Sequence, residues 1–161
     1  METLGPKNTE LAYLAGLFDG EGNVGITERI HKERSNDRVH FIPSINIINT
    51  DPNIPRDFAK LFGGKVTKRV RTQEGHRDIY RWECKSAKAL MKIIPLLMKY
   101  TRSKTMQLIQ LKLLCDRMTG STTPLTEGEI RYRRKLKENI SRMNHQSYEV
   151  RSSEPVLMSE V

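Results

Sequence analysis

Four segments of alternating polarity, arranged as two neighbouring pairs, constrain the fold of this chain more than any other feature. The first pair covers residues 24–31 and 39–49, and the second pair covers 65–72 and 77–85. A repeat of two residues is typical of strands with one buried and one exposed face. A short polar stretch joins the members of each pair, which favours two hairpins. Together they predict a four-stranded antiparallel twisted sheet.

Helical patterns fill the rest of the chain. Capping residues such as Ser, Thr and Asp precede the apolar repeats of helical period. The expected helices cover residues 10–18, 52–62, 87–94, 104–118 and 127–143, with Pro95 breaking or restarting the third helix. The predicted fold class is therefore α+β, in the order α-ββ-α-ββ-α-α-α. Helices should cover one face of the sheet, and the other face should form an open saddle.

The chain has 161 residues, which fits one domain. We expect a flexible leader at 1–8, a single domain at 9–144 that includes the last helix, and a disordered tail at 145–161. The first residues lack the apolar region of a secretory signal, and no stretch is long and apolar enough to span a bilayer. Cys84 and Cys115 lie far apart and suit reduced thiols. These features predict a soluble, intracellular protein.

The balance of charge favours a polyanionic partner. There are 28 Lys and Arg residues against 19 Asp and Glu, which gives a net charge of +9 and an isoelectric point near 9.7. Cationic side chains that neutralise phosphates release counterions and so raise the affinity for nucleic acid. The helix expected at 127–143 is highly basic, and its cations either hold phosphate or form an ordinary solvated face.

Cations also gather on one face of the predicted sheet. Residues 65–71 hold four cations and no acid, and cations recur on the same face of the first, third and fourth strands. This regularity argues against an ordinary solvated face, and a basic two-stranded ribbon fits the major groove of DNA. The residues expected to contact DNA are Thr27, Arg29, His31, Lys32, Arg34, Arg38, His40, Ser44, Asn46, Lys65, Thr67, Lys68, Arg69, Arg71, Arg77 and Arg81.

Small residues recur along the first helix. Ala12, Gly16 and Gly20 form a smooth ridge that lets a second helix approach closely. If that helix belongs to a second copy of the chain, two Glu21 carboxylates meet near a two-fold axis. Like charges so close repel each other unless divalent cations lie between them, and such oxygen ligands suit Mg²⁺. The residues expected at this dimer interface are Ala12, Ala15, Gly16, Asp19 and Gly20.

The segment from Leu14 to Gly22, LAGLFDGEG, resembles the signature of the LAGLIDADG homing endonucleases. The stretches NTDP at 49–52 and LFGG at 61–64 are also similar to members of that family. The helix–hairpin–helix–hairpin–helix order agrees, so the resemblance covers roughly residues 9–118. Residues 119–161 match no pattern that we can assign.

The resemblance implies a metal-dependent active site. Glu21 would bind Mg²⁺ or Mn²⁺ and take part in catalysis, with the carbonyl of Gly20 as a further ligand, whereas Ca²⁺ would bind without supporting cleavage. Such a metal generates a hydroxide nucleophile and stabilises the leaving oxygen. Many members have Asp where this chain has Glu21, which adds a methylene group. Asp19 would serve as a helix-end cap or as a link across the interface.

The resemblance also implies two supporting roles. Asn49, or Thr50 if the register slips by one residue, would help to position the attacking water. A cation at the start of the helix expected at 104–118 would assist the transition state electrostatically. Three residues are candidates, and the first two fit the basic helix start of the family best: Arg102, Lys104 and Lys99.

Family members carry two motifs in one chain or one motif in each of two chains, so the single copy here implies a homodimer. The resemblance further implies that the dimer binds a long pseudo-palindromic double-stranded DNA site, cuts both strands to leave 3′ overhangs and is intron-encoded. Two alternatives stay open. One is a non-cutting relative, either an RNA-binding intron maturase or a DNA-binding regulator, and the other is a general basic architectural protein.

No pattern indicates a small-molecule cofactor or a different metal site. The chain lacks a Walker motif and a dinucleotide-binding glycine pattern. Its four histidines have no metal-ligand spacing, and the first three suit DNA contact or plain exposure better than catalysis: His31, His40, His76 and His145.

Overall fold

The computed structural model describes residues 6–32, 37–118, 120 and 123–153, and it shows an α+β fold. The predicted order of helices and strands is confirmed. The elements are α1 (Pro6–Glu21), β1 (Gly22–His31), β2 (Arg38–Asn49), α2 (Asn53–Phe62), β3 (Lys65–Arg69), β4 (Ile79–Cys84), α3 (Ala87–Met98), α4 (Thr105–Arg117) and α5 (Glu127–Ser153).

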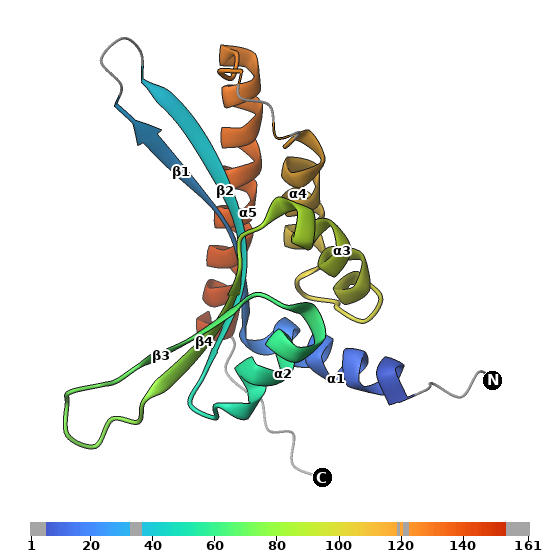
Figure 1. Cartoon of the computed structure of the whole chain (residues 1–161), viewed down its shortest axis with the longest axis vertical. Coiled ribbons are helices and arrows are strands. Elements are labelled where there is room, and N and C mark those ends of the chain that lie inside the picture. Colours follow the sequence, from blue (N-terminus) through green and yellow to red (C-terminus); the bar gives the residue numbers. More distant parts are fainter. Residues whose placement is uncertain (1–5, 33–36, 119, 121–122, 154–161) are drawn as a thin grey trace.

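The four strands form one antiparallel sheet in the order β1-β2-β4-β3. β1 pairs with β2 along its whole length, whereas β4 pairs only with the last part of β2, where Trp82 lies opposite Ile47. The β1–β2 and β3–β4 ribbons therefore diverge from a common centre (Figure 1). Helices α1 to α4 lie on one side of this sheet, and the other side forms the open saddle.

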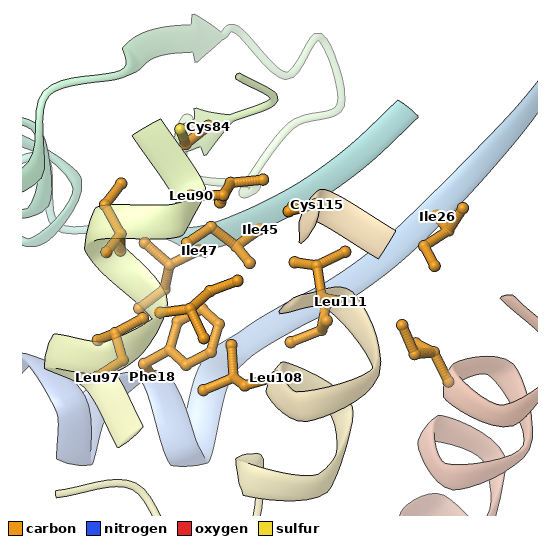
Figure 2. Close-up of a cluster of buried hydrophobic side chains, with 14 of the residues drawn as sticks. Phe18, Ile26, Ile45, Ile47, Cys84, Leu90, Leu97, Leu108, Leu111 and Cys115 are labelled. Carbon is orange, nitrogen blue, oxygen red and sulfur yellow. The ribbon is translucent and has the colours of Figure 1, made fainter. Parts of the chain in front are cut away.

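Alternation along the strands decides which side chains enter the core. Ile45, Ile47 and Trp82 point towards the helices and are fully buried. Figure 2 shows Ile45 and Ile47 beside apolar residues of α1, α3 and α4, namely Phe18, Leu97, Leu108 and Leu111. Burial of each such side chain contributes about 1.5–3 kcal/mol, so the three helices are held to the sheet mainly by this cluster.

The turn after α2 is built around Trp82. Its indole Nε1 donates a hydrogen bond of 2.7 Å to the carbonyl of Gly63. Gly64 has a φ of +88°, and a Cβ there would lie 2.7 Å from the same nitrogen. Only glycine satisfies both constraints, which explains the two glycines of the LFGG stretch.

The first helix extends beyond its predicted bounds at both ends. Residues 6–8 are the first turn of α1 rather than part of a leader, because Pro6 has the backbone angle and the missing N–H that suit a first helical turn. The helix also continues past Phe18 to Glu21. β1 then begins at once with Gly22, where a Cβ would lie 2.3 Å from the ring of Phe18. Residues 1–5 lie outside the described part of the chain.

The later helices also differ from the prediction. α3 continues through Pro95, which is exposed and removes a single backbone hydrogen bond. α5 continues to Ser153, so residues 145–153 are helical rather than disordered, and 154–161 lie outside the described part. Leu136 and Ile140 anchor α5 to the core, and Asn144, just beyond the predicted end, donates a 3.1 Å hydrogen bond to the carbonyl of Val24.

Two smaller expectations agree with the structure. Cys84 and Cys115 are free and buried, and burial raises the pKa of the Cys115 thiol to about 12. In the part of the chain that the structure describes, no helix has the length and apolar character needed to cross a membrane.

Candidate active site and nucleic-acid interface

Glu21 and Asn49 meet where α1 and β2 both end. The amide Nδ2 of Asn49 donates a hydrogen bond of 2.6 Å to the carboxylate Oε2 of Glu21. The amide Oδ1 accepts a hydrogen bond of 2.8 Å from the backbone N–H of Asp51, which fixes the orientation of the amide. The strand register places Asn49 in this position, and Thr50 lies beyond the strand. Of the two candidates from the sequence, Asn49 is therefore the one beside Glu21.

The end of α1 favours a cation. The last carbonyls of a helix lack partners within the helix and carry partial negative charge. Glu21 adds a full negative charge, and the last turn of α1 holds no basic side chain. The Glu21 carboxylate and the Gly20 carbonyl are hard oxygen donors of the kind that Mg²⁺ prefers.

The described residues of one chain do not form a complete metal site. Among the described residues, no group of three or more His, Cys, Asp or Glu side chains could hold a metal ion. The donors at the end of α1 therefore fit a divalent cation if a second set of ligands comes from another molecule, such as a second copy of the chain or a phosphate.

Asp19 joins the end of α1 to the loop between α3 and α4. Its carboxylate oxygens accept hydrogen bonds from the backbone N–H groups of Arg102, at 2.6 Å, and Lys104, at 3.1 Å. The hydroxyl of Ser103 donates to the Asp19 carbonyl at 3.1 Å. Asp19 thus holds the loop that leads into α4, and its place at the dimer interface stays a prediction. Ser103 therefore bonds to α1, and no described side chain caps the N-terminus of α4.

This connection brings Arg102 and Lys104, the two favoured catalytic cations, beside the end of α1. Arg102 is exposed and Lys104 is half-buried. Lys99, the third candidate, caps the C-terminal end of α3 instead, where its N–H donates to the carbonyl of Leu97. The catalytic roles of Arg102 and Lys104 stay predictions.

The open face of the sheet carries most of the predicted DNA contacts. The strand register places those in the strands on the face away from the core, and each is exposed. They are Thr27, Arg29 and His31 in β1, Arg38 and His40 in β2, Lys65, Thr67 and Arg69 in β3, and Arg81 in β4. Three further exposed cations lie just outside the strands: Lys32, Arg71 and Arg77. Arg34 lies outside the described residues.

Three of the predicted contacts are corrected by the structure. Ser44 and Asn46 are on the open face but are 9% and 4% exposed, because β1 and β4 flank the centre of β2 on both sides. Lys68 is on the opposite face, since it alternates with Thr67 and Arg69. Its ammonium forms a 2.9 Å ion pair with Asp78, and this hydrogen bond raises the pKa of Lys68.

Glu83 is an acidic residue of the open face that was not among the predicted contacts. Glu83 accepts a 3.1 Å contact from Arg81 and a 3.0 Å contact from Lys85. The alternation that selected Arg81 also places Glu83 on this face, so the signal was present in the sequence.

The small-residue ridge of α1 is largely open to solvent. Gly16 and Gly20 are exposed, and a Cβ at either residue would meet no atom within 4 Å. Ala12 is half-buried beside them. Ala15 is a correction, because it is 0% exposed and packs in the core one face away from the ridge. Contacts among the described residues of this chain thus give no reason for glycine at positions 16 and 20.

Several cations of the basic helix α5 form ion pairs within the chain. Arg133 is only 7% exposed, and it bonds to Glu129 and to the carbonyl of Arg117. Arg134 donates two hydrogen bonds to one oxygen of Glu28 in β1, at 2.6 and 3.0 Å. These cations stabilise the fold, so the basic composition of α5 does not by itself indicate a phosphate-binding surface.

Comparisons with known proteins agree with this geometry. Residues 14–116 match the sequence profile of the LAGLIDADG endonuclease family. No curated protein matches the chain in sequence. Among solved structures, the archaeal intron-encoded homing endonuclease I-Vdi141I, complexed with DNA, is 17% identical, with a TM-score of 0.68 over 85% of each chain. The homing endonuclease I-CvuI, in complex with its target, is 17% identical, with a TM-score of 0.66 over 85% of this chain and 83% of that one.

A third similar structure is matched over less than half of its own length. The LAGLIDADG meganuclease I-AabMI, bound to uncleaved DNA, is 19% identical, with a TM-score of 0.63, and the match covers 83% of this chain but 46% of that one. These likenesses agree on the fold, and the family profile covers more than half of the sequence. The chain belongs to the LAGLIDADG endonuclease family of DNA-binding nucleases.

Proposed function

We propose that this chain is a site-specific homing endonuclease that acts as a homodimer. The dimer binds a long pseudo-palindromic double-stranded DNA site, with one saddle on each half-site. It hydrolyses one phosphodiester bond in each strand in a reaction that depends on a divalent metal, and it leaves 3′ overhangs. The observation that carries this proposal is the Glu21–Asn49 pair at the foot of an exposed glycine ridge.

The ridge supports the dimer. A glycine inside a helix costs about 1 kcal/mol relative to alanine. Gly16 and Gly20 incur this cost although no contact in the described part of the chain requires glycine at either position. A second α1 packed backbone to backbone would require it, and the two-fold axis between the helices would bring two Glu21 residues together.

The residues at the end of α1 support the chemistry. Glu21 and the Gly20 carbonyl of each copy would hold the metal. Asn49, which donates a hydrogen bond to the Glu21 carboxylate, would help to position the attacking water. Arg102 and Lys104, fixed by Asp19, would offer positive charge to the phosphate. A bound divalent cation would supply Lewis-acid stabilisation of the charge that develops on the phosphate oxygens.

Cleavage of a plasmid library that carries random pseudo-palindromic sites tests the activity. We expect linear products with Mg²⁺ or Mn²⁺ and intact, bound DNA with Ca²⁺. Glu21→Gln should slow cleavage by about a hundredfold or more, because the lost charge removes a metal ligand. Glu138→Gln, which removes an exposed acid from α5, is the matched control and should cleave normally. Binding without cleavage in every divalent ion would refute the nuclease and favour the non-cutting alternative.

Leucine substitutions at two open helical glycines test the dimer. Gly16 and Gly128 both lie in helices, and a Cβ at either residue meets nothing within 4 Å. Gly16→Leu should give a folded monomer that no longer cleaves, while Gly128→Leu should stay dimeric and active. Sedimentation velocity and circular dichroism measure mass and folding. A Gly16→Leu protein that is still a dimer would exclude α1 as the interface.

A further inference from the structure

We infer that Ile48 and Arg81 form a base-reading pair on the open face of the sheet, which recognises a thymine and an adjacent guanine in each half-site. This inference rests on the proposed function, because it assumes that the open face lies in the major groove. It adds a specificity-determining residue, Ile48, that the charge pattern does not reveal.

Ile48 is an apolar side chain in a polar setting. It is 43% exposed, and the strand register places it on the open face between Asn46 and the end of β2. The next residue is Asn49, which bonds to Glu21, so Ile48 lies close to the reacting centre. The only apolar group that a base pair presents in the major groove is the C5-methyl group of thymine. Ile48 is therefore suited to read a thymine near the cleavage site.

Arg81 lies directly opposite Ile48 on β4, with Thr67 of β3 on its other side. One terminal nitrogen, Nη2, contacts Glu83 Oε1 at 3.1 Å, and the second Glu83 oxygen contacts Lys85 at 3.0 Å. Glu83 thus orients the guanidinium while Lys85 balances its charge. The remaining N–H donors of Arg81 are available for guanine O6 and N7, the commonest specific contact of arginine in the major groove.

The distance between the two side chains indicates how far apart the two recognised base pairs lie. Directly opposed side chains in an antiparallel pair have Cβ atoms about 4.5–5.5 Å apart. Successive base pairs are about 3.4 Å apart along the axis. The pair therefore spans neighbouring base pairs, one with a thymine and the other with a guanine.

Single-atom changes in the DNA test this assignment. The site selected from the plasmid library is made as a duplex, and binding is measured by fluorescence anisotropy without divalent cations, so that the duplex stays intact. Replacing the thymine by deoxyuridine removes only the methyl group, and we expect a loss of affinity of about fourfold in each half-site. Replacing the guanine by 7-deazaguanine removes only the N7 acceptor, and we expect a loss of about tenfold.

Protein variants connect each loss to its residue. Ile48→Ala should bind the thymine and deoxyuridine duplexes equally, and Arg81→Gln should no longer distinguish guanine from 7-deazaguanine. Ile30→Ala is the matched control, since Ile30 is 56% exposed but on the opposite face of the sheet, and it should keep both preferences. Selected sites without a thymine–guanine neighbour, or an unchanged affinity for the deoxyuridine duplex, would overturn the inference. A failure of the proposed function would look different, because no site would then be cleaved with Mg²⁺.

Discussion

The two ribbons of the saddle are held in different ways. The β1–β2 ribbon pairs over ten residues, and α5 runs along it. Asn144 of α5 donates a 3.1 Å hydrogen bond to the carbonyl of Val24, and Ile140 packs in the core beside the sheet. The β3–β4 ribbon pairs over five residues, and the loop between its strands is exposed at residues 70–77. The first ribbon is therefore supported by a helix along its length. The second is joined to the body at its base, where β4 pairs with β2 and Trp82 is buried in the core, and its outer end is held by contacts within its own hairpin.

A charged residue on the core face of each ribbon shows the same contrast. Glu28 of β1 bonds to Arg134 of α5, and this hydrogen bond holds the pKa of Glu28 below its ordinary value. Lys68 of β3 bonds to Asp78, which directly precedes β4 in the same hairpin. The ion pair of the first ribbon joins β1 to α5, whereas the ion pair of the second ribbon lies within the β3–β4 hairpin. We expect the β3–β4 ribbon to adjust its position on DNA and the β1–β2 ribbon to act as the fixed reference.

The largest expected difference between the ribbons is in their dependence on the core. Ile140→Ala removes a side chain that is 2% exposed from the helix that supports β1, and should lower the free energy of unfolding by about 2–4 kcal/mol. Val66→Ala, in the half-buried part of β3, should cost about 1 kcal/mol. Urea titration followed by circular dichroism measures both. Equal losses would show that the two ribbons are anchored alike.

Much of this fold follows from local patterns in the sequence. Alternation predicts all four strands to within a few residues, and it places Ile45, Ile47 and Trp82 in the core. It cannot tell that Ser44 is buried on the open face, because that depends on the neighbouring strands. Likewise, local patterns cannot tell that Asn144, just beyond the predicted end of α5, bonds to Val24 of β1, which is 120 residues earlier in the chain.

The same contrast between local patterns and long-range contacts applies to the candidate site. Glu21 and Asn49 could be identified because they occupy fixed places in recognisable motifs. The role of Asp19 could not, because its partners Arg102 and Lys104 are 83 and 85 residues away. The face of Lys68 was misassigned because its charge was weighed above its position in the alternation. Strand register, rather than residue type, decides which cation reaches the open face.

The ion pairs of the ribbons should differ in their pH dependence. Glu28→Gln should lower the free energy of unfolding by about 1–2 kcal/mol near neutral pH, because it removes a charged hydrogen bond to a largely buried carboxylate. The pKa of Glu28 is lower in the folded state than its ordinary value of 4.5. The stabilisation is therefore complete above that value and disappears as the pH falls below it through the folded pKa. Asp78→Asn, in an exposed pair, should have a smaller effect.

Urea titrations of both variants and the unmodified protein, from neutral to acidic pH, measure these differences. The Glu28→Gln protein should converge with the unmodified protein in acid. A gap that persists well below the ordinary pKa of glutamate would mean that Glu28 acts through packing rather than through its charge.

The smallest expected effects are those of single phosphate contacts, and they test whether the second ribbon reaches the DNA. Each cation that neutralises a phosphate contributes about 0.9 to the slope of log affinity against log salt concentration, so a substitution present in both copies of a dimer should reduce that slope by about two. Arg29→Gln, in the fixed ribbon, should show this reduction. Arg69→Gln should match it if the β3–β4 ribbon closes onto the duplex. Lys112→Gln, which removes a cation paired with Asp116 on α4, should leave the slope unchanged. An unchanged slope for Arg69→Gln alone would mean that the second ribbon stays away from the phosphates, and the contrast in anchoring would then be a contrast in DNA contact as well.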